Sequence, residues 1–168
     1  FSNNMKTDML SQLCIDSLRL ANKTLRESGL SGTKEIDTDQ DISTQGDHDV
    51  AETMIDFYKN SGIQAILLDE EKGRVQLGYN MKPKYVIAID DIDGTDNYNR
   101  GLGMLPHCSV VTIFDKSEPF FRDAIVAGVI EHNSGNIWHA VRGEGTYFNG
   151  KKVETSGKKD MNRRTSVI

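Results

Sequence analysis

Cysteine and long apolar segments are scarce in this 168-residue sequence. Two cysteines, Cys14 and Cys108, are too few for a disulfide framework or a zinc cluster, so we expect two reduced thiols. Apolar runs such as residues 124–130 are far shorter than the ~20 residues of a membrane span. The N-terminus lacks a basic region followed by an apolar segment, so we expect no signal peptide. These absences predict a cytoplasmic globular protein.

The charge balance is acidic, with 20 Lys and Arg against 25 Asp and Glu and a formal net charge of −5. A general nucleic-acid binder needs a basic surface to displace counterions, so this class is disfavoured. An acidic protein favours a cation as partner, or an anionic substrate that is reached through a cation. The chain is long enough to bury one hydrophobic core, which predicts one domain.

The hydrophobic pattern predicts helices first and strands afterwards. Residues 8–27 and 47–60 each carry an apolar stripe with helical spacing. The polar segment 31–46 between them predicts a loop or a weak hairpin. Asn149-Gly150 is typical of a type I′ hairpin turn. Strands are predicted over residues 65–68, 85–89, 109–114, 124–131, 136–141 and 146–148.

This order of elements indicates an α+β fold. Two helices would pack on a mostly antiparallel six-stranded sheet, because most of the predicted strands are joined by short connections. The basic, polar tail from Ser156 is typical of a linker.

The residues best suited to chemistry follow the apolar run 85–89. Asp90 and Asp93 are three apart, so a tight turn at the strand end can aim both carboxylates at one point. Gly94 allows a backbone conformation that a side chain would forbid. Thr95 suits the start of a helical turn, whose free N–H groups would face an anion. Carboxylates repel an anion unless a cation lies between them, and Mg²⁺, which prefers oxygen ligands, meets that need.

A second acidic pair, Glu70 and Glu71, follows the predicted strand 65–68. If the two strands are neighbours in one sheet, Glu70 and Asp90 converge. Taken alone, the pair is equally consistent with a solvated acidic turn. The histidines are scattered and no Ser-His-Asp pattern is recognisable, so no catalytic triad is expected.

Residues 90–98 read Asp-Asp-Ile-Asp-Gly-Thr-Asp-Asn-Tyr. They resemble the signature Asp-Pro-Ile-Asp-Gly-Thr-x-Asn-(Phe/Tyr) of the inositol monophosphatase-like, metal-dependent, lithium-sensitive phosphatases. The Glu70-Glu71 pair matches the acidic pair that precedes this signature. Residues 43–47 resemble the family's Val-Thr-x-x-Asp segment, and residues 143–150 resemble its late hairpin. The resemblance runs from about Met5 to Val153.

The resemblance implies two metal sites. Glu70 and Asp90 would bind a first Mg²⁺ together with the backbone carbonyl of Ile92. Asp90 and Asp93 would bind a second, with Asp90 bridging the two ions. Mn²⁺ is the alternative cofactor. The reaction would then be a two-metal hydrolysis, in which one ion lowers the pKa of water and the other stabilises the leaving oxygen.

The resemblance also implies how the remaining matched residues act. Gly94 and Thr95 would offer backbone N–H groups to the substrate phosphate. The Thr95 hydroxyl and Asp47 would orient the attacking water. Glu71 would lie just outside the metal ligands or close to a third ion.

The sequence departs from the family pattern in two respects. The family's proline is Asp91 here, and we expect this side chain to point away from the metals. The chain also stops near the end of the family's first domain. The resemblance therefore implies an N-terminal metal- and phosphate-binding domain over residues 5–156 and a linker over residues 157–168. A C-terminal domain, whose Trp-Asp motif completes the second metal site, would be missing.

The resemblance thus implies a cytoplasmic Mg²⁺-dependent phosphomonoesterase that acts on a small phosphorylated metabolite and is a homodimer in its full-length form. No nucleic-acid polymer or membrane is expected as partner. Inositol phosphate, fructose 1,6-bisphosphate and 3′(2′),5′-bisphosphate nucleotides stay open as substrates, although Ile92 and Thr95 favour the inositol type. A non-catalytic metal-binding or dimerising fragment is the alternative. We expect the 168-residue chain to be inactive alone.

Overall fold

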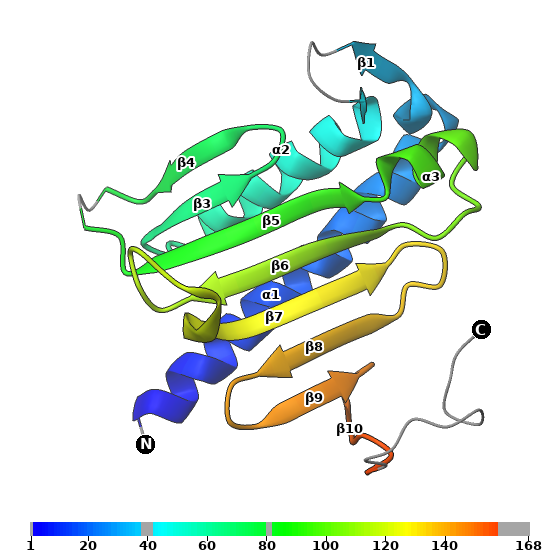
Figure 1. The fold of residues 1–168 in the computed structure, drawn as a ribbon. Coiled ribbons are helices and arrows are strands. Elements are labelled where there is room, and N and C mark those ends of the chain that lie inside the picture. The colour runs from blue at the N-terminus through cyan, green and yellow to red at the C-terminus, as the bar shows by residue number, and fades with distance from the viewer. Residues whose placement is uncertain (1, 38–41, 80–81, 158–168) are drawn as a thin grey trace.

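The computed structural model describes residues 2–37, 42–79 and 82–157. Three α-helices, two short 3₁₀ segments and ten strands make up this part of the chain (Figure 1). In chain order they are α1 (Ser2–Ser28), η1 (Gly29–Thr33), β1 (Glu35–Asp37), β2 (Ile42–Thr44), α2 (Gln45–Asn60), β3 (Ala65–Asp69), β4 (Gly73–Leu77), β5 (Tyr85–Asp93), α3 (Thr95–Arg100), β6 (Cys108–Phe114), η2 (Phe121–Asp123), β7 (Ala124–Glu131), β8 (Ile137–Val141), β9 (Gly145–Phe148) and β10 (Lys151–Val153).

Eight of the strands form one mixed sheet in the order β10-β9-β8-β7-β6-β5-β3-β4. The pair β3 and β5 runs parallel, whereas every other neighbouring pair in this sheet runs antiparallel. Strands β1 and β2 form a separate antiparallel hairpin. Because β3 and β5 point the same way, their carboxyl ends reach the same edge of the sheet (Figure 1).

The α+β class is confirmed, and most strand pairs are antiparallel as predicted, but the number of six strands was wrong. The sheet has eight strands and is mixed, and α3 is a third helix. Strand β4 escaped prediction because it is an edge strand in which only Leu77 is buried, so it lacks an apolar run. Strand β10 is equally polar, with two exposed lysines. Segment 31–46 contains the β1–β2 hairpin, and residues 38–41 of its acidic run lie outside the described residues.

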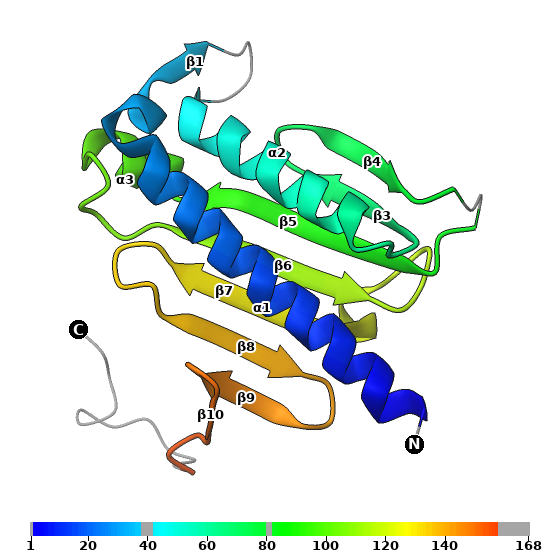
Figure 2. The same ribbon diagram turned by 180° about the vertical axis from the view of Figure 1, so that it is seen from behind.

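Both long helices cover the same face of the sheet (Figure 2). Helix α1 packs over β6, β7 and β8, and α2 packs beside it over β5. The apolar stripe of each helix packs against the apolar side chains on this face of the sheet. The Ser17 and Tyr58 hydroxyls lie 2.9 Å apart between the two helices, so this buried polar pair is satisfied. The largest fully buried side chains include Leu10, Leu18, Met54, Leu67, Ile87, Ile113 and Ile130.

The opposite face of the sheet carries no helix within the described residues (Figure 1). Side chains that alternate with the core residues point to this face, and most of them are apolar. Leu68 is 42% exposed and Trp138 is 47% exposed. Solvated faces of antiparallel sheets normally carry polar side chains, so this face is unusually apolar. Across the described ranges, no helix is both long and apolar enough to cross a membrane.

Candidate functional site

The turn between β5 and α3 has the backbone geometry that the sequence predicted. Gly94 has φ of 93° and ψ of 39°, a left-handed conformation that favours glycine. The carbonyl of Gly94 accepts the N–H of Tyr98 at 3.0 Å, which starts the short helix α3. The backbone of His107 packs 3.6 Å from where a Cβ on Gly94 would lie. Such a distance is ordinary van der Waals contact, so the positive φ, and not a lack of space, favours glycine here.

A β-bulge lies directly before this turn. Asp90 pairs with Val110 and Asp93 pairs with Cys108, so two residues of β5 face only Ser109 on β6. On a regular strand, residues three apart point to opposite faces. The bulge adds the extra residue that lets Asp90 and Asp93 turn to the same side. Sequence analysis placed this convergence in a turn, whereas the bulge produces it within the strand.

Several carboxylates gather around Asp90. Burial, and then the negative charges of Glu70, Asp93, Asp47 and Asp69 in that order, together raise the pKa of Asp90 to about 6. Glu70 follows β3 and Asp90 lies near the end of β5. The parallel pairing of these strands thus brings the two acidic segments together. Sequence analysis predicted that Glu70 and Asp90 converge if their strands are neighbours. Strands β3 and β5 are neighbours in the sheet.

Asp47 and Thr95 form the second part of the site. The Thr95 hydroxyl lies 3.1 Å from Oδ1 of Asp47 and 2.9 Å from the carbonyl oxygen of Ile92. Oδ2 of Asp47 accepts hydrogen bonds from the backbone N–H of Thr44 at 2.8 Å and from its hydroxyl at 2.5 Å. The bond from the Thr44 backbone N–H, together with the one that the N–H of Asp47 donates to the Thr44 hydroxyl at 3.4 Å, forms the capping box of α2. The helix cap therefore fixes Asp47 with one oxygen directed at Thr95.

Glu71 lies in a mixed-charge group that sequence analysis missed. Its Oε2 is 3.5 Å from Nε2 of His48, and Nδ1 of the same ring is 3.2 Å from Nζ of Lys72. Lys72 also pairs with Glu52 at 3.2 Å. His48 lies directly after Asp47 on α2, so the first turn of this helix supplies both groups. Nothing in the sequence marked His48, because its partners Glu71 and Lys72 come from the β3–β4 turn, more than twenty residues further along the chain.

Asp91 points into surroundings different from those of Asp90. It is 2% exposed, and burial together with Asp69 raises its pKa to about 10, with smaller contributions from Asp47 and Glu71. Neither carboxyl oxygen of Asp91 has a hydrogen-bond partner by distance and angle within the described chain. Burial thus favours the protonated form of the Asp91 carboxyl. That this side chain points away from the metals stays a prediction.

The donors in this region are of the type that hard cations prefer, namely carboxylates and the carbonyl of Ile92. A cation among Glu70, Asp90 and Asp93 would also replace their mutual repulsion with attraction. Within residues 2–37, 42–79 and 82–157, however, no three or more His, Cys, Asp or Glu side chains are arranged to hold a metal ion. The site residues are thus brought near one another but do not form a closed coordination shell.

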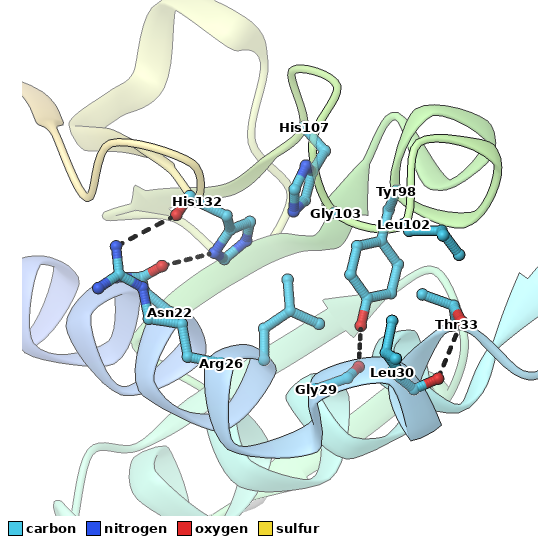
Figure 3. A pocket seen from close by; sticks show the side chains of 11 residues that line it. Asn22, Arg26, Gly29, Leu30, Thr33, Tyr98, Leu102, Gly103, His107 and His132 are labelled. Atoms are coloured by element: carbon cyan, nitrogen blue, oxygen red, sulfur yellow. Dashed lines mark hydrogen bonds between the residues drawn. The ribbon is translucent and has the colours of Figure 1, made fainter.

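A cavity of about 260 Å³ lies on the other side of the turn (Figure 3). The rings of Tyr98, His107 and His132 line one wall, with centroids 5.0 and 5.2 Å apart along the row. None of the predicted site residues lines this cavity, and sequence analysis did not detect it. The residues around it are Asn22, Leu25, Arg26, Gly29, Leu30, Thr33, Tyr98, Leu102, Gly103, His107 and His132.

The sequence matches the inositol monophosphatase family over residues 7–168, so the chain belongs to that family. It is similar to the bifunctional NADP phosphatase/NAD kinase of Methanococcus maripaludis, with 30% identity over 118 residues that cover 62% of this chain and 20% of that protein. It is also similar to the fructose-1,6-bisphosphatase/inositol-1-monophosphatase of Methanocaldococcus jannaschii, with 28% identity over 85 residues that cover 51% of this chain and 30% of that protein.

The fold is shared with solved members of the family. The calcium-bound structure of an inositol monophosphatase family protein from Staphylococcus aureus matches with a TM-score of 0.67 at 21% identity. The match covers 88% of this chain and 53% of that one. The chain thus spans about half the length of this solved relative and less than a third of the two curated relatives.

Proposed function

We propose that this chain is the metal- and phosphate-binding domain of an Mg²⁺-dependent phosphomonoesterase of the inositol monophosphatase type. The observation that carries the proposal is the convergence of Glu70, Asp90 and Asp93 beside the turn at Gly94. Hydrolysis of a phosphomonoester needs cations next to an anion site. Carboxylates at the ends of two parallel strands, followed at once by free backbone N–H groups, meet both needs.

Glu70, Asp90 and the Ile92 carbonyl would hold one Mg²⁺, and Asp90 and Asp93 would hold the second. Mn²⁺ is the alternative ion. When bound, the ions supply an activated water and charge stabilisation for the leaving oxygen. The bulge between Asp90 and Asp93 supports the shared role of Asp90, because it directs both side chains to one side of the strand.

Gly94 and Thr95 would donate backbone N–H groups to the phosphate. The Thr95 hydroxyl and Asp47, which lie 3.1 Å apart, would orient the attacking water. The capping box of α2 supports this role, because it leaves Asp47 little freedom to rotate. Glu71, paired with His48, would lie beside the ligands and add to their negative charge.

The substrate would be a small phosphorylated metabolite in the cytoplasm. Ile92 and Thr95 favour inositol phosphate. The names of the two curated relatives support NADP-like nucleotides and fructose 1,6-bisphosphate as alternatives. We expect neither a nucleic-acid polymer nor a membrane as partner, and we expect a homodimer in the full-length form.

Full activity would require a second domain. Residues 5–156 would form the N-terminal domain, and residues 157–168 would lead to the second. Most of this linker, residues 158–168, lies outside the described part of the chain. The apolar sheet face that bears Leu68 and Trp138 supports the proposal, because it offers a surface on which another layer can pack. We therefore expect little or no turnover by this chain alone.

Calorimetric titration with Mn²⁺ or Mg²⁺ tests the metal site. Asp90→Asn is expected to weaken binding at least tenfold and more than Asp91→Asn does. The matched control is Asp96→Asn, because Asp96 is exposed and pairs with Arg100 at 3.4 Å. Equal losses of affinity in Asp90→Asn and Asp91→Asn would mean that Asp90 is not the aspartate that bridges the two ions.

Phosphate release tests the reaction. Inositol phosphate, fructose 1,6-bisphosphate and a 3′-phosphoadenosine nucleotide are offered to this chain and to the same chain extended through a second domain. Hydrolysis by the extended chain alone would support the proposal. Rapid turnover by the 168-residue chain would contradict the need for a second domain. Inactivity of the extended chain on every substrate would favour a non-catalytic metal-binding or dimerising module.

A further inference from the structure

Ser109 on β6 lies opposite the bulge in β5 and is fully buried. Its hydroxyl bonds to the backbone carbonyl of Asp91 and lies 2.8 Å from Nε2 of His132. Asp91 lies between Asp90 and Asp93, the two residues that the bulge turns to one side. A side chain from the neighbouring strand thus bonds to the backbone that the bulge removes from the regular ladder.

His132 connects this bond to helix α1. Its Nδ1 lies 3.2 Å from Oδ1 of Asn22, and its carbonyl accepts a hydrogen bond from Nη2 of Arg26 at 3.4 Å (Figure 3). Its own N–H donates to the carbonyl of His107 at 3.1 Å, and the two imidazole rings stack. The ring is therefore held by Ser109 at Nε2, by Asn22 at Nδ1 and by the stacked ring of His107.

The directions of these hydrogen bonds follow from the single hydroxyl hydrogen of Ser109. The Asp91 carbonyl can only accept, so Ser109 donates to it, and Nε2 of His132 must donate to Ser109. Burial, and then the positive charges of His107 and Arg26, lower the pKa of His132 to about 3. The ring is neutral near pH 7 and carries its one proton on Nε2. Its Nδ1 then accepts from the NH₂ group of Asn22, an orientation reached by a half-turn of that amide.

The order Ser109–His132–Asn22 resembles a nucleophilic triad, but the geometry excludes that role. Ser109 is 0% exposed, so no substrate reaches its hydroxyl. Its hydrogen is also bonded to a carbonyl rather than to the imidazole, so the ring cannot accept it as a general base. What the arrangement does provide is a buried chain of bonds from α1 to the backbone of Asp91.

We propose that Ser109 and His132 are positioning residues, which hold the bulge in the shape that directs Asp90 and Asp93 to a shared cation. The binding of a cation rests on the proposed function. The stabilisation of the bulge by Ser109 and His132 does not depend on it. Neither residue would touch a substrate or a metal ion. Their effect would reach the site through the Asp91 carbonyl alone.

Two variants and two matched controls test the proposal by calorimetric titration with Mn²⁺, well below the unfolding temperature. Ser109→Ala and His132→Gln are each expected to weaken Mn²⁺ binding about tenfold, which corresponds to ~1.4 kcal/mol. The controls are Ser134→Ala, which removes an exposed hydroxyl bonded to Glu131, and His139→Gln, which replaces a buried histidine stacked on Tyr147. Both controls are expected to keep the affinity of the unaltered protein.

Coupling and rescue separate positioning from a general loss of stability. The double variant is expected to bind Mn²⁺ no more weakly than Ser109→Ala, because His132 acts through the Ser109 hydroxyl. Ser109→Thr, which keeps the hydroxyl, is expected to retain most of the Mn²⁺ affinity that Ser109→Ala loses. Additive losses in the double variant, or equal losses in the two controls, would overturn the proposal.

Nuclear magnetic resonance supplies a measurement that does not depend on metal. The ¹⁵N signals of His132 are expected to show a protonated Nε2 and a bare Nδ1, and His132→Gln is expected to shift the amide signals of residues 91–94. If the unaltered protein binds no Mn²⁺ but these amides shift, the proposed function fails and the positioning stands. If the amides and the Mn²⁺ affinity both stay unchanged in Ser109→Ala and His132→Gln, the positioning is overturned.

Discussion

Lowering the pH from 7.5 to 5.5 is expected to destabilise the fold through His132. This ring is 4% exposed, and its pKa falls from 6.5 to about 3 because of burial, His107 and Arg26. Between these two values the unfolded chain binds a proton that the folded chain does not bind. The stability of the fold is therefore unaffected by this ring above about pH 6.5. The free energy of unfolding decreases as the pH falls from there toward 3. One unit below the unfolded pKa, at pH 5.5, the loss is about 1.4 kcal/mol.

Urea unfolding in the presence of a chelator, at pH 7.5 and at pH 5.5, measures this loss. The unaltered protein and His132→Gln share all other titrating groups, so the carboxylates affect both proteins alike. The difference between their two pH responses isolates His132. We expect the unaltered protein to lose about 1.4 kcal/mol more than the variant over this range. Equal pH responses, or a larger loss in the variant, would refute the conclusion that the folded protein holds this ring neutral.

Three further experiments, with five substitutions in all, test the fold and the site. Thr44→Ala removes the cap that holds Asp47 and is expected to cost about 1 kcal/mol in urea unfolding; no loss would contradict the capping box. Gly94→Ala and Gly143→Ala both place a side chain at positive φ, so each is expected to lower the free energy of unfolding by about 1–2 kcal/mol. Only Gly94→Ala is expected to weaken Mn²⁺ binding in calorimetry. Ser17→Ala is expected to lower the melting temperature more than Tyr58→Phe does, because it leaves the buried tyrosine hydroxyl without a partner, whereas Ser17 keeps the carbonyl of Cys14. A larger loss in Tyr58→Phe would contradict this reading of the hydroxyl pair.

Local patterns in the chain were enough to predict the two long helices and the turn at Gly94. Apolar spacing predicted the helices because it depends only on which face of each helix meets the core. The helix boundaries were less accurate, since α1 begins at Ser2 rather than at residue 8 and α2 begins at Gln45 rather than at residue 47. The edge strand β4 was missed because a strand that buries one side chain has too weak an apolar pattern.

The candidate site divides in the same way. The signature over residues 90–98 marked the acidic residues and the glycine, because their types and spacing are local properties of the chain. The family resemblance paired Asp47 with Thr95, but no local pattern of the chain predicts contacts between such distant segments. The bond between Asp47 and Thr95 joins residues 48 positions apart, and the link from Asn22 through His132 joins residues 110 positions apart.

Tertiary structure decided which carboxylates share surroundings. Parallel pairing of β3 with β5 brings Glu70 to Asp90, and the bulge opposite Ser109 turns Asp93 toward the same side. Neither feature leaves a trace in composition or periodicity, because strand direction and register depend on how distant segments pack. A sequence pattern reports the burial of each residue along its own element. The meeting of two elements is decided only when the whole sheet forms, since the free energy of that pairing belongs to both strands together.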